Sequence, residues 1–187
     1  MIIRVRNKHI LEIDDFQFRC CIGKNGLTNN KIEGDKCTPK GKFKLNRIFY
    51  RPDRILKFKS KIGKIKIKKN MGWCDDPKSK HYNQLIYISK KKIKCEKLYR
   101  KDRKYDILIE LDYNRKKIIP HKGSAIFLHL TNNYKPTAGC IAISENDMKI
   151  LIKILNKKNY IKIDQPLSPK IFVPILKKVE PNLQATS

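Results

Sequence analysis

Apolar and polar residues alternate over several short stretches of the chain. Ile2–Arg6 and Ile10–Ile13 carry apolar side chains at alternate positions or in short runs, and Asn7-Lys8 lies between them. Alternation with a period of two is typical of a half-buried strand, so we expect a hairpin here. Similar patterns predict strands at Phe16–Ile22, Lys42–Phe49, Ile65–Lys68, Leu85–Ser89, Tyr105–Leu111 and Tyr160–Ile163, and continuous apolar runs predict buried strands at Ala125–Leu128 and Ile141–Ile143.

One segment has a helical pattern instead. Ser144 is a favourable helix N-cap, and an acidic residue follows it at the third helical position. Apolar residues then recur at helical spacing, so we expect a helix over residues 145–157 with its apolar stripe on a sheet. The predicted fold is therefore mainly β, as a two-sheet sandwich or a partly closed barrel with one main α-helix. The apolar residues of the stripe are Met148, Leu151, Ile154 and Leu155.

The length of 187 residues suits one domain with a sizeable core. We expect residues 1–165 to form that domain and the proline-containing residues 166–187 to form a C-terminal tail. No apolar run approaches the ~20 residues of a membrane-spanning helix. The N-terminal residues 1–9 have no long apolar segment and no cleavage site, so we expect no export signal in the chain as given.

The chain is strongly basic, with 44 Lys and Arg against 17 Asp and Glu and a formal net charge of +27. Such charge would suit nucleic acid, acidic lipid or an anionic wall polymer. The lysines are scattered, however, and alternate with isoleucine at Lys64–Lys68 as on the solvent face of a strand. The aromatic spacing and recognition helix of common nucleic-acid binders are missing, so we expect no nucleic-acid partner. A basic, non-enzymatic binding module remains an alternative.

The cysteines indicate neither zinc binding nor a disulfide framework. None of them forms a CxxC pair. We expect mostly reduced thiols, with one structural pair between Cys20 or Cys21 and Cys74 as an alternative. The six cysteines are Cys20, Cys21, Cys37, Cys74, Cys95 and Cys140.

The strongest candidate chemistry lies within residues 125–144. An apolar run leads into His129, a polar loop follows, and Gly139-Cys140 precedes a second apolar run. Two strands joined by this loop would bring His129 and Cys140 face to face, and a neighbouring base can activate a thiol. The amides of Gly139 and Cys140 could then form an oxyanion hole. The residues alone equally allow a small buried cysteine and a satisfied core histidine.

The motif His…Thr-x-Gly-Cys is similar to the active-site signature of the L,D-transpeptidase (YkuD-type) family. Glu33–Phe43 resembles the hairpin of that family that carries Gly-Asp and Thr-Pro. Gly72–Pro77, Tyr82-Asn83 and Gly123–His129 resemble a stand-alone bacterial branch of the family. The resemblance covers about residues 18–163, with the motifs in the order of the family.

This resemblance implies acyl transfer on peptidoglycan tetrapeptide stems. Cys140 corresponds to the nucleophile and His129 to the general base, while Leu130 supplies a backbone carbonyl and Gly139 belongs to the oxyanion hole. The thioester would pass to an amine, or to water in an L,D-carboxypeptidase. The family uses no cofactor and acts in the cell envelope or periplasm, where anionic envelope polymers could be partners. Ala138 and Ala142 depart from the family pattern and leave the acceptor open.

The expected substrate-binding residues have structural alternatives. Arg54 could hold a substrate carboxylate or pair with Asp53 on the surface. Asp75 and Asp76 could grip a substrate amine, or Gly72–Pro77 could be a loop capped by aspartate. His121 lies in a turn and is a rival base. The complete expected set is Arg54, Trp73, Asp75, Asp76, Tyr82 and Thr137, with no metal ligand among them.

Overall fold

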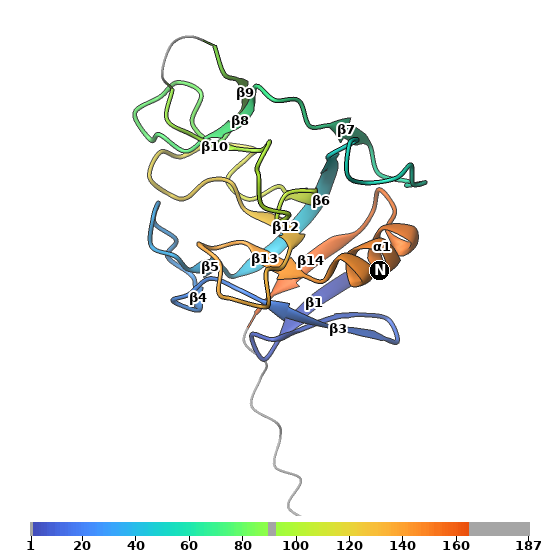
Figure 1. Cartoon of the computed structure of the whole chain (residues 1–187). Helices are drawn as coiled ribbons and strands as arrows, with labels where there is room; N and C mark the ends of the chain where they lie inside the picture. Colours follow the sequence, from blue (N-terminus) through green and yellow to red (C-terminus); the bar gives the residue numbers. More distant parts are fainter. Residues whose placement is uncertain (1, 90–92, 165–187) are drawn as a thin grey trace, which may run out of the picture.

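The computed structural model describes residues 2–89 and 93–164, and the predicted tail 166–187 lies outside them. The described chain is mainly β with one main helix, as predicted (Figure 1). The helix is α1 (Glu145–Ile154). The strands are β1 (Ile2–Arg6), β2 (Ile10–Ile13), β3 (Phe16–Cys21), β4 (Leu27–Thr28), β5 (Thr38–Pro39), β6 (Gly41–Tyr50), β7 (Lys64–Lys66), β8 (Met71–Cys74), β9 (Leu85–Tyr87), β10 (Cys95–Lys97), β11 (Ile107–Leu111), β12 (Phe127–Leu130), β13 (Ile141–Ile143) and β14 (Tyr160–Ile163).

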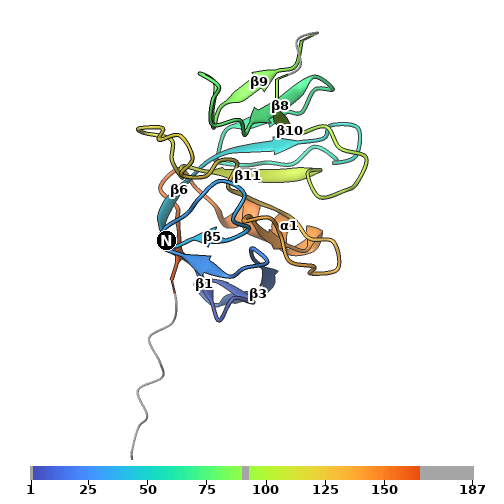
Figure 2. The same cartoon turned by 90° about the vertical axis from the view of Figure 1, so that its left-hand side faces the viewer.

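A nine-stranded sheet of the described residues has the order β11-β12-β13-β3-β2-β1-β14-β6-β7. A further pairing between β11 and β6 closes this sheet into a barrel, with β7 attached outside the closure. The sheet is therefore closed rather than partly open. A small sheet, β10-β8-β9, lies at the end of the molecule away from β1 and β3, as both views show (Figures 1 and 2).

Local patterns account for the N-terminal hairpin and the start of the helix. β1 pairs with β2 in antiparallel register, and Asn7 and Lys8 between them have positive φ angles, as a tight turn requires. The Ser144 hydroxyl accepts a hydrogen bond of 3.1 Å from the Asp147 N–H, which is an N-cap contact. Helix α1 ends three residues earlier than predicted, since Leu155 has extended backbone angles.

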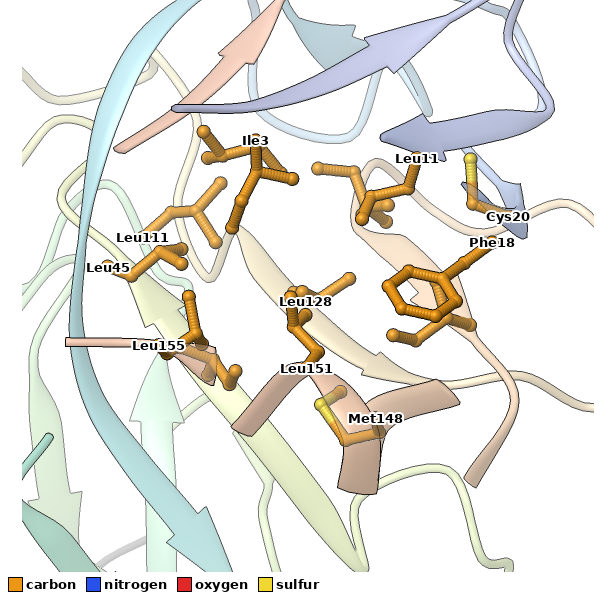
Figure 3. Close-up of a cluster of buried hydrophobic side chains, with 14 of the residues drawn as sticks. Ile3, Leu11, Phe18, Cys20, Leu45, Leu111, Leu128, Met148, Leu151 and Leu155 are labelled. Carbon is orange, nitrogen blue, oxygen red and sulfur yellow. The ribbon is translucent and has the colours of Figure 1, made fainter. Parts of the chain in front are cut away.

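The helix covers the interior of the barrel with its apolar face. Met148, Leu151 and the following Leu155 are fully buried and point toward Leu128 of β12 and toward the N-terminal strands (Figure 3). Each such side chain contributes about 1.5–3 kcal/mol when fully buried. This contact anchors the middle of the barrel, directly beneath β12.

A second apolar cluster covers the other face of β12. Leu128 and Leu130 belong to the barrel core, whereas Phe127 faces Trp73, which is 1% exposed. Burial on both faces explains why the run before His129 is continuously apolar. It also places the side chains of one face of β12 beneath the small sheet.

The small sheet corrects one of the alternatives given for Gly72–Pro77. That segment is not a loop throughout, because its first residues belong to β8, with Trp73 inside the strand. Residues 95–97 form β10, which pairs with β8. The strand pairings hold these segments over the second apolar cluster. No helix in the described parts of the chain has the length and apolar character needed to cross a membrane.

Candidate active site

Two neighbouring strands place His129 and Cys140 on the same side of the barrel wall. β12 and β13 pair in parallel, with His129 opposite Ala142, and Cys140 lies two positions before Ala142. Positions two apart on a strand face the same side. Both side chains line one cavity, and they are 5% and 7% exposed. The structure therefore brings together the two residues that the motif indicated.

The Cys140 sulfur is held by backbone groups. Its S–H donates to the Ala125 carbonyl at 3.2 Å, and the sulfur accepts from the Phe127 N–H at 3.4 Å. Burial, together with the nearby Glu96 carboxylate, raises the pKa of the Cys140 thiol to about 12. The resting side chain is thus a neutral thiol at physiological pH.

His129 has a defined tautomer. Its Nδ1 lies 2.8 Å from the Leu130 carbonyl oxygen. A carbonyl only accepts hydrogen bonds, so Nδ1 carries the proton and Nε2 keeps a free lone pair. Burial is the main cause that lowers the pKa of His129 to about 4, and the charges of Lys104 and Arg100 lower it further. The imidazole is therefore neutral and can accept a proton.

The backbone before Cys140 depends on a glycine and on Thr137. Gly139 has φ = +143°, and a Cβ at this position would lie 2.9 Å from the Cys37 carbonyl oxygen. The Thr137 hydroxyl accepts from the Gly139 N–H at 3.1 Å and donates to the Cys140 carbonyl at 2.6 Å. In this structure the Gly139 amide is engaged by Thr137, and its part in the expected oxyanion hole stays a prediction.

The role of Thr38 was not evident from the sequence, where this residue stands only as part of the Glu33–Phe43 motif. Thr38 is fully buried, and its hydroxyl donates to the Gly139 carbonyl at 2.8 Å while it accepts from the Gly23 N–H at 2.8 Å. The hydroxyl thus ties the hairpin to the segment that carries the thiol. The Thr-Pro motif of the hairpin was the signal that could have identified it.

The cavity has a volume of about 530 Å³ and carries charges of both signs. Its basic lining residues are Lys31, Lys36, Arg100, Lys104 and Lys135, and its acidic ones are Glu33, Asp75 and Glu96. The Oδ1 atom of Asp75 is buried without a hydrogen-bond partner, and burial raises the pKa of this carboxyl. The cavity can therefore receive a ligand that carries both amine and carboxylate groups.

Two of the six expected substrate-binding residues line this cavity, Asp75 and Thr137. Arg54 instead donates to the buried carboxylate of Asp106 at 3.0 Å, outside the cavity lining. The Trp73 indole N–H donates to the Asn83 side chain at 2.9 Å. These contacts give Arg54 and Trp73 structural roles.

The remaining expected residues also lie outside the cavity lining. Tyr82 is buried, and its hydroxyl donates to Glu33 at 2.5 Å, so it supports a residue that does line the cavity. Asp76 accepts from the Lys78 N–H at 3.0 Å in a turn. The rival base His121 is exposed and does not line the cavity.

All six cysteines lie within the described residues and are free thiols. The alternative of a pair between Cys20 or Cys21 and Cys74 is therefore not realised. Among residues 2–89 and 93–164, no three His, Cys, Asp or Glu side chains gather closely enough to hold a metal ion.

Comparisons with known proteins find a family model and solved structures similar to this chain. A model of the L,D-transpeptidase catalytic domain, YkuD, matches residues 2–164. The crystal structure of the helical cell shape determining protein Pgp2 from Campylobacter jejuni aligns at 17% identity and a TM-score of 0.49, over 88% of this chain and 47% of that chain. A point mutant of Pgp2 aligns at 18% identity and a TM-score of 0.49, over 88% and 46%.

The chain thus spans about half the length of those two solved structures. A search of curated proteins finds no match. The family match extends over most of the described chain, from β1 to the end of β14. The chain belongs to the L,D-transpeptidase catalytic domain family, YkuD.

Proposed function

We propose that this protein catalyses cysteine-dependent acyl transfer on peptidoglycan stem peptides, with Cys140 as nucleophile and His129 as base. The observation that carries the proposal is the placement of a neutral imidazole and a thiol on one wall of the same cavity. A thiol becomes strongly nucleophilic when a neighbouring base removes its proton.

The reaction begins when Nε2 of His129 takes the proton of the Cys140 thiol. The sulfur attacks the carbonyl at the L-centre of the third stem residue, and the terminal D-residue leaves with the proton that His129 returns. A thioester and a free amino acid result. An amine from another stem, or water, then attacks the thioester, and His129 again relays the proton.

The hydrogen bond from Nδ1 of His129 to Leu130 supports this proton transfer. It fixes the ring so that Nε2 stays available, and the carbonyl stabilises the imidazolium that forms. A backbone carbonyl thus takes the part that a carboxylate takes in other triads. For the developing oxyanion, the backbone N–H of Cys140 is the remaining donor candidate, since Thr137 holds the Gly139 amide.

Intact-mass analysis after exposure to a carbapenem tests the nucleophile. We expect one covalent adduct on Cys140 and none in the Cys140→Ser variant, because serine is a weak nucleophile in a site arranged for a thiol. Cys95→Ser is the matched control, since Cys95 is a partly exposed free thiol that does not line the cavity. An adduct that persists in Cys140→Ser would exclude the proposed nucleophile.

Mass spectrometry of muropeptides separates the two outcomes of the thioester. Cross-linked dimers indicate transpeptidation, whereas tripeptides without dimers indicate an L,D-carboxypeptidase. Ala138 and Ala142 stand at positions where many members of the family carry His and Asn, and these departures leave the acceptor open. The muropeptide assay therefore decides whether an amine or water accepts the acyl group.

The net charge of +27 supports a second, weaker proposal, attachment to anionic envelope polymers. Such binding should weaken as salt is added and should survive Cys140→Ser. If Cys140→Ser retained every measurable function, the alternative of a basic, non-enzymatic module would replace the enzymatic proposal.

A further inference from the structure

Two residues that sequence analysis did not select lie against the reacting pair. Tyr105 is 4% exposed, and its hydroxyl donates to Oε1 of Glu96 at 2.5 Å. Glu96 belongs to β10 of the small sheet, and both residues line the same cavity as Cys140. The pair therefore connects the small sheet to the site.

The Tyr105 ring also contacts the base. It packs edge-on against the His129 ring with centroids 5.2 Å apart, and against Phe127 at 6.0 Å. Tyr105 and Cys140 belong to the same buried cluster. A phenol has a single proton to donate, so its hydroxyl can satisfy one acceptor fully at a time.

The two residues act on the thiol in opposite directions. The negative charge of Glu96 raises the pKa of Cys140, whereas the hydroxyl of Tyr105 lowers it. Burial is the main cause that raises the pKa of Glu96, and the charges of Asp75 and Glu33 add to it, while the Tyr105 hydrogen bond and the Arg100 guanidinium 3.9 Å away act in the opposite direction. Glu96 is therefore the ionisable group that competes most directly with the thiolate.

We propose that Tyr105 is the side-chain donor to the Cys140 thiolate during acyl transfer, and that Glu96 is a positioning residue that withholds this hydroxyl while it is ionised. In the structure the phenol donates to Glu96 at 2.5 Å, while its hydroxyl lies close enough to the sulfur to lower the pKa of Cys140. When Glu96 is protonated, the Tyr105 O–H turns to the sulfur. The phenol keeps its proton in both states, and only its acceptor changes.

The other groups that face Cys140 do not replace this pair. The Lys31 ammonium lowers the pKa of Cys140, but it is held by Asp35 at 2.5 Å. His129 is neutral above about pH 4 and accepts protons at Nε2 rather than donating there. Among the side chains that face the sulfur, the phenol is therefore the neutral donor.

Alkylation of Cys140 by iodoacetamide tests the pair in the full-length protein. Tryptic residues 123–149 contain Cys140 and no other cysteine, so the modified peptide reports this thiol alone. We expect Glu96→Gln to accelerate alkylation at pH values where the wild-type Glu96 is ionised. We expect Tyr105→Phe to slow alkylation at lower pH, where Glu96 is protonated and the phenol donates to the sulfur. At pH values below the pKa of Cys140, a shift of one unit in that pKa changes the alkylation rate by about 3-fold. The change is less than tenfold because a thiolate of lower pKa is also a weaker nucleophile.

Opposite changes of the alkylation rate in the two variants distinguish this inference from a merely structural role of the two residues. A packing defect would move both variants in the same direction, and that result, or no change in either, would overturn the proposal. Tyr99→Phe and Glu12→Gln are the matched controls, because Tyr99 contacts Asp53 and Glu12 pairs with Arg6, both outside the cavity. Neither control should change the rate.

The pH profile of the alkylation rate in the wild-type protein is a test that does not depend on how well a variant folds. As pH rises through the ionisation of Glu96, the logarithm of the alkylation rate should climb with a slope below one, because the thiol becomes harder to ionise. The Glu96→Gln profile should keep a slope of one over the same range. A wild-type slope of one throughout would contradict the proposal.

This inference rests on the proposed role of Cys140, but its test does not. Alkylation reports ionisation of the thiol without any peptide substrate. If carbapenem acylation fails but the two variants change the alkylation rate in opposite directions, only the proposed function is contradicted. If a carbapenem acylates Cys140 but the two variants change the alkylation rate in the same direction, only the Tyr105–Glu96 inference is contradicted.

Discussion

At the scale of single residues, burial keeps the side chains of both Cys140 and His129 uncharged. The pKa of Cys140 is raised to about 12 and that of His129 is lowered to about 4. A preformed thiolate–imidazolium pair would require the opposite shifts. In the proposed reaction the proton would therefore move during attack, as in serine hydrolases, and the free Nε2 of His129 would be the atom that receives it.

The pH dependence of carbapenem acylation follows from this ionisation state. Since the lowered pKa keeps His129 unprotonated, we expect the acid limb of the acylation rate to have its midpoint near pH 4. An unshifted histidine would place it at about 6.5. Stopped-flow or quenched-flow acylation across the acid range measures the limb, and a midpoint near 6.5 would contradict the burial argument.

The same shift has a consequence for stability that this experiment must control. Between about pH 6.5 and 4 the unfolded chain binds a proton at His129 that the folded protein does not bind, so stability falls as pH falls through this window. Circular dichroism at each pH shows whether the protein is still folded. Rates count only where it is.

Thr38 carries a prediction about support of the nucleophile segment. Thr38→Val keeps the volume but removes the hydroxyl bonded to Gly139 and Gly23. We expect a loss of about 1–3 kcal/mol in the free energy of unfolding, because a buried N–H and a buried carbonyl lose their partner. Acylation should slow as well. Urea unfolding and the carbapenem assay measure the two effects.

Thr28→Val is the matched control for this prediction. The Thr28 hydroxyl accepts from the Asn30 N–H at 3.0 Å in an exposed turn, where water can replace it. If both variants lose equal stability, or if Thr38→Val acylates at the wild-type rate, Thr38 does not support the site as described.

At the scale of elements, sequence patterns predicted the elements whose formation depends on residues close together in the chain. The hairpin of β1 and β2, the start of α1 and the strands on both sides of the catalytic loop follow from alternation, capping and apolar runs. In the small sheet, β9 lies within the predicted strand Leu85–Ser89, whereas β8 was missed because it is buried at all four positions and shows no alternation, and β10 because it is short. The register of this sheet depends on contacts distant in sequence.

The same limit explains which site residues were missed. His129 lies on β12 and Cys140 directly precedes the adjacent β13, with one loop between the strands, so a local motif could identify them. Glu96 reaches the cavity only through the pairing of β10 with β8, which no local pattern encodes. The pairing of Arg54 with Asp106 was not evident from the sequence for a related reason, since Asp106 lies 52 residues later in the chain.

The helix gives a prediction that belongs to this scale. Ser144→Ala removes the hydroxyl that accepts from the Asp147 N–H, so we expect a loss of ~1 kcal/mol in the free energy of unfolding. Urea denaturation measures it. Ser60→Ala is the control, since its hydroxyl accepts from the Ile62 N–H in a loop and should matter less. Equal losses would show that capping of α1 is not the cause.

At the scale of the whole molecule, closure of the barrel was the feature least accessible to sequence analysis. It depends on the pairing of β11 with β6, whose residues are about 60 positions apart. Closure gives β12 two covered faces, one against the barrel core and one against the small sheet. The site lies on the second face, so the small sheet controls how deeply the thiol is buried.

The net charge of +27 leads to the last prediction, which concerns the molecule as a whole. Like charges repel one another in the compact state, and raising NaCl from ~10 mM to ~150 mM shortens the screening length from about 30 Å to about 8 Å. Surface ion pairs also weaken in salt, but each contributes only ~0–1 kcal/mol. We therefore expect added NaCl to raise the melting temperature, by roughly 2–4 °C for each kcal/mol of repulsion relieved.

A variant with fewer positive charges separates repulsion from other effects of salt. Lys57, Lys59 and Lys61 are exposed in the segment between β6 and β7. Replacing all three with glutamine lowers the net charge by three, so the melting temperature should depend less on salt than in the wild type. Calorimetry over the same NaCl series measures both proteins. If salt lowers the wild-type melting temperature, attraction within the ion-pair network outweighs the repulsion inferred from the net charge.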